Sequence, residues 1–312
     1  MTLITSTAVG VESHEFALEV VNRPARPRKE RLKLVLLNAR GGAHLDAMLA
    51  CLGRPPLENA DVIMLCEVDV MTRRAHRRKV AHELAAALGM SMVYQREFGF
   101  PRAGGGPPVA FMGNALLCAQ PLEHVRGVLL PNLYPGRRIK RLIGSPCGIV
   151  ASATFNRRRL TFGVAHLNSR WEPLGRAKQM EDFLAAIAPG APALIAGDLN
   201  TTTVDLRTPH ALAATAWRML TNPWRFRRPE RYEPLFERLH VAGFEVDGAN
   251  VPYKPTFTFS RLVPPFFRPK LDWIATRGLT PLRRTARVVP ARQSFLRGRL
   301  SDHDFVTCDF EL

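Results

Sequence analysis

Polar side chains of the types that bind metals and move protons stand at the ends of short apolar runs in this 312-residue chain. Each run has the length of a buried strand, and a strand end is where a rigid sheet aims a side chain into a cleft. Six strands that end in this way predict that their polar residues converge on one edge of a sheet sandwich. These residues are Asn38, Glu67, His166, Asp198 with Asn200, Asp272, and the pair Asp302-His303.

The residue types suit the hydrolysis of a phosphate ester. That reaction needs neutralisation of the charge on the phosphoryl oxygens and an activated water molecule. Mg²⁺ takes oxygen ligands and keeps several waters, so one or two carboxylates suffice to hold it. Glu67 is therefore the first candidate for a metal ligand, and Asn38 either binds the same ion or holds Glu67 in place. Asp198 either orients the attacking water or completes a second metal position.

The two histidines are candidates for proton transfer. His303 either acts as a general base or donates a hydrogen bond to the phosphate, and a carboxylate partner such as Asp272 would fix its tautomer and raise its basicity. His166 is expected to play the corresponding part at the leaving group. Asn200 is expected to donate a hydrogen bond to the developing charge on the phosphorane, because an amide does so without titrating.

Taken singly, most of these residues also have an ordinary structural interpretation. A lone histidine such as His166 is more often structural, Asp198-Leu199-Asn200 suits a turn or a helix cap, and Asn38 beside two glycines suits a turn. Asp272 is the exception, because it lies within the apolar run 271–274. A buried carboxylate is costly unless it is paired or bound to a metal.

Alternating strands and helices are predicted to position these groups. Helical spacing predicts helices over residues 43–52, 73–88 and 171–187, and a Gly/Pro-rich loop is expected over 99–108. Strands are predicted at residues 33–37, 62–66, 193–196, 271–276 and 304–310, with a hairpin formed by 148–155 and 160–166. The chain has no internal repeat, so we expect one α/β domain over residues 32–312. A flexible N-terminal arm is expected over residues 1–31, which close with a Pro/Arg segment.

The composition limits the classes of partner and compartment. There are 44 Lys+Arg residues against 27 Asp+Glu, a net charge of +17, which either steers the protein toward a polyanion or belongs to a solvated surface. The five cysteines are odd in number and irregular in spacing, so they exclude a disulfide framework or a zinc site and predict reduced thiols in a cytoplasmic protein. The sequence shows no secretory signal, and no run approaches the roughly 20 apolar residues of a transmembrane helix.

The order and spacing of the motifs resemble the endonuclease/exonuclease/phosphatase (deoxyribonuclease-I-like) family. The resemblance covers residues from about 33 to 312. It extends to Arg176 and Gln179 in the helix after His166, and to Pro255-Thr256-Phe257. The motifs that carry it are Asn38, Glu67, His166, Gly197-Asp198-Leu199-Asn200, Leu271-Asp272-Trp273-Ile274 and Ser301-Asp302-His303.

The resemblance implies a four-layer sandwich of two mixed β-sheets flanked by helices, and a hydrolase that depends on Mg²⁺ or Mn²⁺. By motif, Glu67 would bind the metal with Asn38 beside it, and Asp302 would lie close to the metal or the phosphate. Asp198 and Asn200 would position water and phosphate, and Asp272 would pair with His303. His166 matches the deoxyribonuclease branch. Cys66 departs from the Gln or Asn that many members carry before the glutamate, and we expect it to point into the core.

The substrate is narrowed but not identified by these features. A Mg²⁺-dependent nuclease or phosphodiesterase is the leading interpretation, since basic clusters favour a polyanion. We expect Arg170, Arg297 and Arg299 to bind substrate, because arginine forks suit phosphate. The alternatives are a lipid or small-molecule phosphoesterase of the same fold, with a membrane surface as partner, and a non-catalytic, basic nucleic-acid-binding protein.

Overall fold

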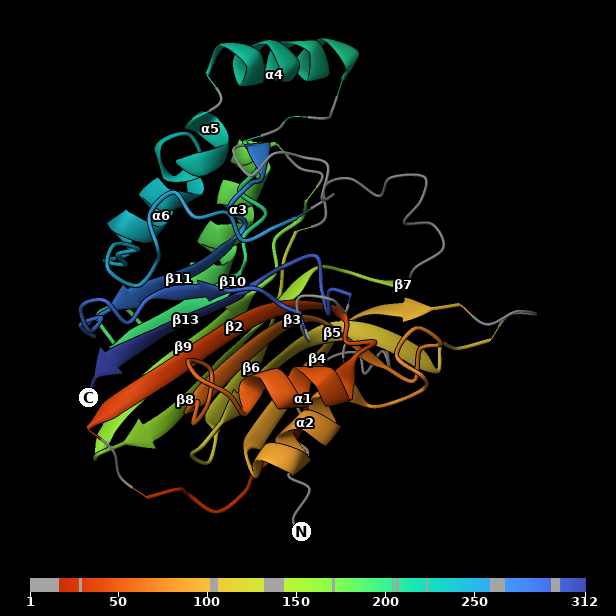
Figure 1. The fold of residues 1–312 in the computed structure, drawn as a ribbon, viewed down its shortest axis with the longest axis vertical. Coiled ribbons are helices and arrows are strands. Elements are labelled where there is room, and N and C mark those ends of the chain that lie inside the picture. Colours follow the sequence, from red (N-terminus) through yellow and green to blue (C-terminus); the bar gives the residue numbers. More distant parts are fainter. Residues whose placement is uncertain are drawn as a thin grey trace.

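Two β-sheets lie face to face in the computed structural model (Figure 1). It describes residues 17–27, 30–101, 106–131, 143–169, 172–203, 205, 208–222, 224–258, 267–292 and 298–312. The strand content follows the sequence pattern, because the apolar runs rich in Val, Ile, Leu and Phe suit strands that are covered on both faces.

The first sheet has the strand order β1-β4-β5-β3-β2-β13-β12, and β7 pairs with β4 off this path. At its centre β2 and β3 run parallel, whereas β13 runs antiparallel to β2. Its strands are β1 (Leu18–Val21), β2 (Arg31–Gly41), β3 (Val62–Val70), β4 (Ser91–Phe100), β5 (Ala110–Cys118), β7 (Ile143–Gly144), β12 (Arg287–Val289) and β13 (Phe305–Glu311).

The second sheet has the order β11-β10-β9-β8-β6. Here β9 and β10 are parallel, and β11 is antiparallel to β10. The predicted hairpin is present as β8 and β9, which turn at Asn156 and Arg157, both with positive φ. The strands are β6 (Glu123–Leu129), β8 (Cys147–Phe155), β9 (Arg158–Ala165), β10 (Ala193–Asp198) and β11 (Asp272–Arg277).

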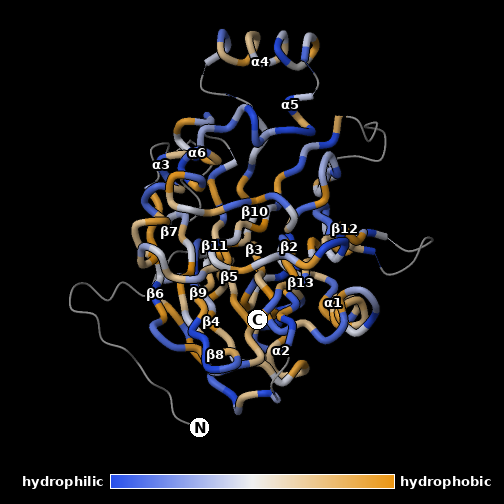
Figure 2. Tube along the Cα trace, turned by 90° about the vertical axis from the view of Figure 1, so that its left-hand side faces the viewer, coloured by the Kyte–Doolittle hydropathy of each residue, from blue (hydrophilic) through white to orange (hydrophobic). Residues whose placement is uncertain are grey.

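Helices cover the outer face of each sheet, which makes four layers. Helices α1 (Leu45–Leu52) and α2 (Val80–Leu88) bury Met48 and Leu84 against the first sheet. Helices α3 (Pro173–Leu184) and α6 (Leu235–Val241) bury Phe183 and Leu239 against the second. A third apolar cluster lies between the sheets, and Figure 2 shows apolar chain along the central strands. The predicted four-layer α/β sandwich is therefore confirmed.

The predicted flexible arm over residues 1–31 must be corrected where the structure describes it. Leu18–Val21 forms β1, which pairs with β4 at the edge of the first sheet. Leu18 and Val20 pack against the core between the sheets, while Glu19 bonds to His82 and Arg96. A four-residue strand is too short to stand out as an alternating pattern in the sequence, and its pairing with β4 and its contacts with the core stabilise it.

Other predicted boundaries shift for local reasons. Helix α2 begins at Val80 rather than 73, because buried Asp69 accepts hydrogen bonds from the Thr72 hydroxyl and the Arg74 guanidinium and holds that segment in a turn. The loop expected over 99–108 begins later, since β4 continues to Phe100.

The region between β10 and α6 stands apart at one end of the sandwich (Figure 1). It contains α4 (Pro209–Thr221), α5 (Trp224–Arg227) and the 3₁₀-helix η3 (Pro229–Arg231). Among the described residues, no helix has both the length and the apolar character needed to cross a membrane.

Candidate active site

Strand direction brings the predicted site residues to one edge of the sandwich. The parallel strands β2 and β3, and likewise β9 and β10, have their carboxyl ends at that edge. The antiparallel strands β11 and β13 begin there, so Asp198 at the end of β10 lies opposite Asp272 at the start of β11. Residues from both sheets are in contact, because the Asn38 amide from the first sheet donates to Asp198 in the second at 2.9 Å.

Asn38 and Glu67 form the part of the site contributed by the first sheet. The buried Asn38 side chain donates from Nδ2 to Glu67 Oε1 at 3.2 Å as well as to Asp198 Oδ2. Glu67 sits in a bulge of β3 with φ of +51°, where the register with β5 shifts. A bulge re-aims one side chain out of the regular alternation, and the Glu67 side chain is 27% exposed. Glu67 thus presents a carboxylate at the site opening.

His303 and Asp272 form a buried pair beside Asp198. His303 Nδ1 lies 2.8 Å from Asp272 Oδ2, and its Nε2 lies 3.6 Å from Asp198 Oδ2. The Phe257 ring contacts the imidazole edge to face at 4.9 Å between centroids. Asp272 Oδ1 is buried without a hydrogen-bond partner in the described structure. Asp272 therefore orients His303, as expected, and leaves one oxygen for a further ligand.

The charges in this group shift its proton affinities. Burial lowers the pKa of His303, but the charges of Asp272 and Asp198 outweigh it and raise that pKa to about 10. Burial raises the pKa of Asp198 to about 6, against the opposing charge of His303. At neutral pH the group therefore contains a protonated imidazole next to a carboxyl group whose pKa lies close to neutrality.

His166 has a partner that the sequence did not suggest. Its Nδ1 lies 3.1 Å from Glu97 Oε2, and its Nε2 lies 3.8 Å from Glu67 Oε1. Burial lowers the pKa of His166, yet the charge of Glu97 raises it to about 10. Glu97 is itself buried on β4, and burial raises its pKa. The sequence signal that could have identified Glu97 is its place in an alternating pattern, since Val93, Gln95 and Glu97 are alternate positions of one strand and all three are buried.

The Gly197-Asp198-Leu199-Asn200 motif has a steric basis. A Cβ on Gly197 would lie 1.7 Å from the Ala165 carbonyl oxygen, so only glycine fits beside β9. Asn200 has φ of +50°, and its amide donates to the Leu167 carbonyl at 2.7 Å, while its backbone N–H donates to Asp198 Oδ1 at 3.0 Å. The motif thus forms a turn that also fixes the Asp198 carboxylate.

The loop before β13 is tied to the first sheet. The Ser301 hydroxyl donates to the Asn38 carbonyl at 2.7 Å, and Asp302 pairs with Arg40 at 3.3 Å. Arg299 donates to Asp304 at 2.6 Å and to the Ser301 carbonyl at 2.8 Å. These contacts give Arg299 a role in holding the loop, and its expected substrate contact stays a prediction. Arg170 and Arg297 lie outside the described residues.

A buried ion pair supports the turn that follows Asn200. Arg176 on α3 donates to Glu233 at 3.1 Å, with both side chains fully buried, and Glu233 also accepts the Thr203 backbone N–H at 2.7 Å. Gln179, one turn further along α3, accepts the Asn168 backbone N–H. The helix that follows His166 therefore anchors both neighbouring loops.

We expect Glu233→Gln to lower the free energy of unfolding by about 3–5 kcal/mol, because it removes the carboxylate that pairs with the buried Arg176 guanidinium. Urea unfolding followed by circular dichroism measures this. The exposed substitution Glu181→Gln on α3 serves as the control and should change stability by well under about 1 kcal/mol. A loss in Glu233→Gln no larger than the control's would contradict the assignment.

The donor atoms of the site suit a hard divalent cation. Carboxylate and amide oxygens dominate, and Mg²⁺ and Mn²⁺ prefer such ligands. Glu67 provides an accessible carboxylate beside the buried Asn38, and Asp198, Asp272 and His303 offer ligand atoms all within 4.8 Å of one another. The unpaired Asp272 Oδ1 is a further oxygen of the kind that a cation or its water satisfies. Cys66, a softer ligand, lies in the core between the sheets, as expected.

Comparison with known proteins gives the same picture as the geometry. The family model described as "Endonuclease/Exonuclease/phosphatase family" matches residues 26–303. No curated protein matches the chain in sequence.

Solved structures show the fold at low sequence identity. An endonuclease/exonuclease/phosphatase from Beutenbergia cavernae DSM 12333 is 17% identical with a TM-score of 0.58, covering 91% of this chain and 72% of its own. D. rerio TDP2 complexed with single strand DNA product is 16% identical with a TM-score of 0.56, covering 91% of this chain and 100% of its own. The human Nocturnin catalytic domain with bound sulfate is 16% identical with a TM-score of 0.54, covering 97% and 99%.

Proposed function

Because the chain belongs to the endonuclease/exonuclease/phosphatase family, whose members hydrolyse phosphate esters, we propose that it is a divalent-metal-dependent phosphodiesterase acting on nucleic acid. The observation that carries the proposal is the contact between the two sheets, in which His303, paired with Asp272, lies beside Asp198 while Asn38 joins Asp198 to Glu67. One edge of the fold thus holds the protonated His303, the Asp198 carboxyl group with its raised pKa, and the accessible carboxylate of Glu67.

Glu67 is the residue proposed to hold the metal, with Asn38 beside it. Asn38 donates its N–H group to Glu67, so it positions that carboxylate and leaves its own amide oxygen to the Arg40 backbone N–H at 3.0 Å. These bonds favour a role for Asn38 in holding Glu67 in place over a role as a ligand of the ion. Asp302 is the more peripheral candidate, since it pairs with Arg40. When bound, Mg²⁺ or Mn²⁺ supplies charge neutralisation and a more acidic water.

Asp198 is proposed to take the proton of the attacking water, and His303 to donate to a phosphoryl oxygen. A general base works best when its pKa lies near the working pH, which is the case for Asp198 with its pKa of about 6. His303, with its pKa raised to about 10, carries its proton at neutral pH. His303 is therefore better suited to donate a hydrogen bond to the phosphate than to act as a general base.

His166 is proposed to act on the other side of the phosphate, at the leaving oxygen. The charge of Glu97 raises the pKa of His166 to about 10, so the imidazole enters the reaction as a proton donor. Asn200 contributes a fixed turn beside Asp198. Its side-chain N–H group is bonded to the Leu167 carbonyl, so a contact with phosphate would require that bond to be exchanged.

Nucleic acid is the proposed substrate class for two reasons. The net charge of +17 favours a polyanion, and the similar D. rerio protein was solved with a single strand DNA product. The five cysteines are free, which supports a proposed place in the reducing cytoplasm.

We expect the purified protein to cleave plasmid DNA or single-stranded RNA with Mg²⁺ or Mn²⁺, and to stop when a chelator removes the ion. The same assay would include sphingomyelin and inositol phosphates as the lipid and small-molecule alternatives. Turnover restricted to those two would refute the nucleic-acid substrate. Tight DNA binding with no chelator-sensitive cleavage of any substrate would support the non-catalytic alternative.

A further inference from the structure

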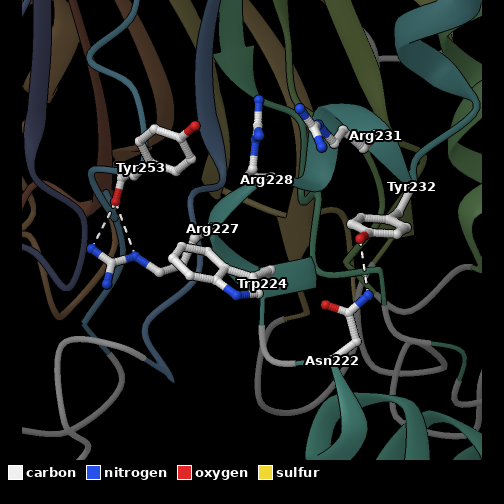
Figure 3. A pocket seen from close by; sticks show the side chains of 7 residues that line it. All are labelled: Asn222, Trp224, Arg227, Arg228, Arg231, Tyr232 and Tyr253. Carbon is white, nitrogen blue, oxygen red and sulfur yellow. Dashed lines mark hydrogen bonds between the residues drawn. The ribbon is translucent and has the colours of Figure 1, made fainter.

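A second, arginine-rich pocket lies where the segment 222–232, between β10 and α6, meets Tyr253 in the segment between α6 and β11. It has a volume of about 510 Å³ and is lined by Asn222, Trp224, Arg227, Arg228, Arg231, Tyr232 and Tyr253 (Figure 3). None of these residues belongs to the site described above. The volume falls within the range of about 300–1,000 Å³ that is usual for small-ligand pockets.

The pocket combines flat aromatic surfaces with fixed positive charge. Trp224 and Tyr253 lie edge to face with centroids 6.3 Å apart, and the Arg228 guanidinium lies 4.9 Å from the centre of the Tyr253 ring. The third ring belongs to Tyr232, whose hydroxyl accepts a hydrogen bond from Asn222 at 2.9 Å. Figure 3 shows Arg228 and Arg231 between Tyr253 and Tyr232.

The arginines differ in how far they are already engaged. Arg227 donates to the Tyr253 carbonyl at 2.9 and 3.1 Å, which fixes the Tyr253 segment against α5. Arg228 pairs with Glu230 at 3.3 Å. Arg231 is exposed and has no ion-pair partner within the described parts of the chain. Trp224 is also exposed, with 52% of the residue accessible to solvent.

The pocket is attached to the end of the second sheet that carries the catalytic groups. The Lys270 backbone N–H donates to the Phe226 carbonyl of α5 at 3.4 Å, two residues before Asp272. Glu233, two residues after η3, accepts the Thr203 backbone N–H at 2.7 Å, three residues after Asn200. The segments that form the pocket are therefore hydrogen-bonded to the chain next to Asp272 and Asn200.

We propose that this pocket is a binding subsite for one nucleotide of a single-stranded nucleic acid, with the base stacked on Trp224 or Tyr253 and the phosphate held by Arg231 and Arg228. The proposal rests on the proposed function for its choice of substrate. Stacking on aromatic rings combined with arginine contacts to the backbone is how proteins hold single strands without reading their sequence. Exposed rings alone would also suit an apolar partner, but the arginines of the lining select an anion.

The test measures binding without cleavage. A fluorescein-labelled oligothymidylate of about 12 nucleotides is titrated with the full chain in chelator, and fluorescence anisotropy gives the affinity. We expect Trp224→Ala to weaken binding about tenfold or more, and Trp224→Phe to retain most of the affinity, because a phenyl ring still stacks. Arg231→Ala should weaken binding and reduce the slope of log affinity against log salt by about 0.7, the value for one single-strand phosphate contact.

Matched controls are available near the pocket. Trp217→Ala removes a tryptophan of α4 that is 68% exposed and outside the lining, and Arg238→Ala removes an exposed arginine of α6. Both should bind the oligonucleotide like the parent protein. The proposal is overturned if Trp224→Ala and Arg231→Ala bind as the controls do, if a free mononucleotide competes as well as the strand, or if the effects appear only with anionic lipid vesicles.

Failure of the subsite and failure of the proposed function are distinguishable. Bis(p-nitrophenyl) phosphate carries no nucleotide, so its metal-dependent turnover by the parent protein tests the proposed hydrolysis without the subsite. Turnover of that ester by the parent protein with no oligonucleotide binding would refute the subsite alone. The opposite result is that the parent protein binds the oligonucleotide, Trp224→Ala does not, and the parent protein hydrolyses no phosphodiester. That result would uphold the subsite and refute the proposed hydrolysis.

Discussion

Asp198→Asn is expected to reduce phosphodiester hydrolysis by about a thousandfold, the size of contribution that a positioned general base makes. The parent protein should gain activity as the pH rises through about 6, because Asp198 works only when ionised and burial has raised its pKa to about 6. A bound cation favours the ionised carboxylate and would move this rise to lower pH. The residual activity of the variant should lack the rise.

Stability separates this role from a structural one. The pKa of Asp198 is higher in the folded protein than its ordinary value of 3.8. Ionised Asp198 therefore lowers the free energy of unfolding at pH values above 3.8, and this loss disappears as the pH falls. Asp198→Asn should therefore be as stable as the parent or more stable at pH 7, measured by thermal unfolding. Asp182→Asn on α3, where Lys178 is the partner at 2.8 Å, is the control and should retain full turnover. A variant at position 198 that keeps more than about a tenth of the activity would refute the assigned role.

Glu67→Gln is expected to abolish both metal-dependent hydrolysis and the stabilisation that the metal gives. A ligand that binds only the folded state raises its stability by about 2.7 kcal/mol at a concentration 100 times the dissociation constant. The parent protein should therefore show a higher Tm in Mg²⁺ or Mn²⁺ than in chelator, and the variant should show the same Tm in both. The Tm readout does not depend on the substrate being correctly identified.

The control for Glu67→Gln is a variant that removes a carboxylate outside the site. Glu181→Gln takes away an exposed glutamate of α3 and should keep both the shift in Tm and the hydrolysis. An unchanged metal-induced shift in Glu67→Gln would show that the ion binds elsewhere, for example between Asp198 and Asp272, whose ligand atoms also lie close together.

Much of the site was accessible from the sequence because chemistry and strand ends coincide there. Asn38 and Asp198 end apolar runs and Asp272 lies within one, and the directions of β2, β10 and β11 bring all three to one edge. The expected pairing of Asp272 with His303 is present at 2.8 Å. A buried carboxylate in an apolar run needs a partner, and that requirement is visible without coordinates.

The sequence by itself therefore determined the layered sandwich, the family and the polar residues that gather at one edge, although β2 and β3 continue past Asn38 and Glu67 to Gly41 and Val70. Only the tertiary structure decided which partner each group meets, because those partners are separated by long stretches of chain. Glu97 reaches His166 across 69 residues, and Arg299 pairs with Asp304. The pocket of Trp224 and Tyr253 likewise joins two segments that carry no common motif. Local patterns state which face of a strand is buried, but the packing of one element on another sets what a buried charge pairs with.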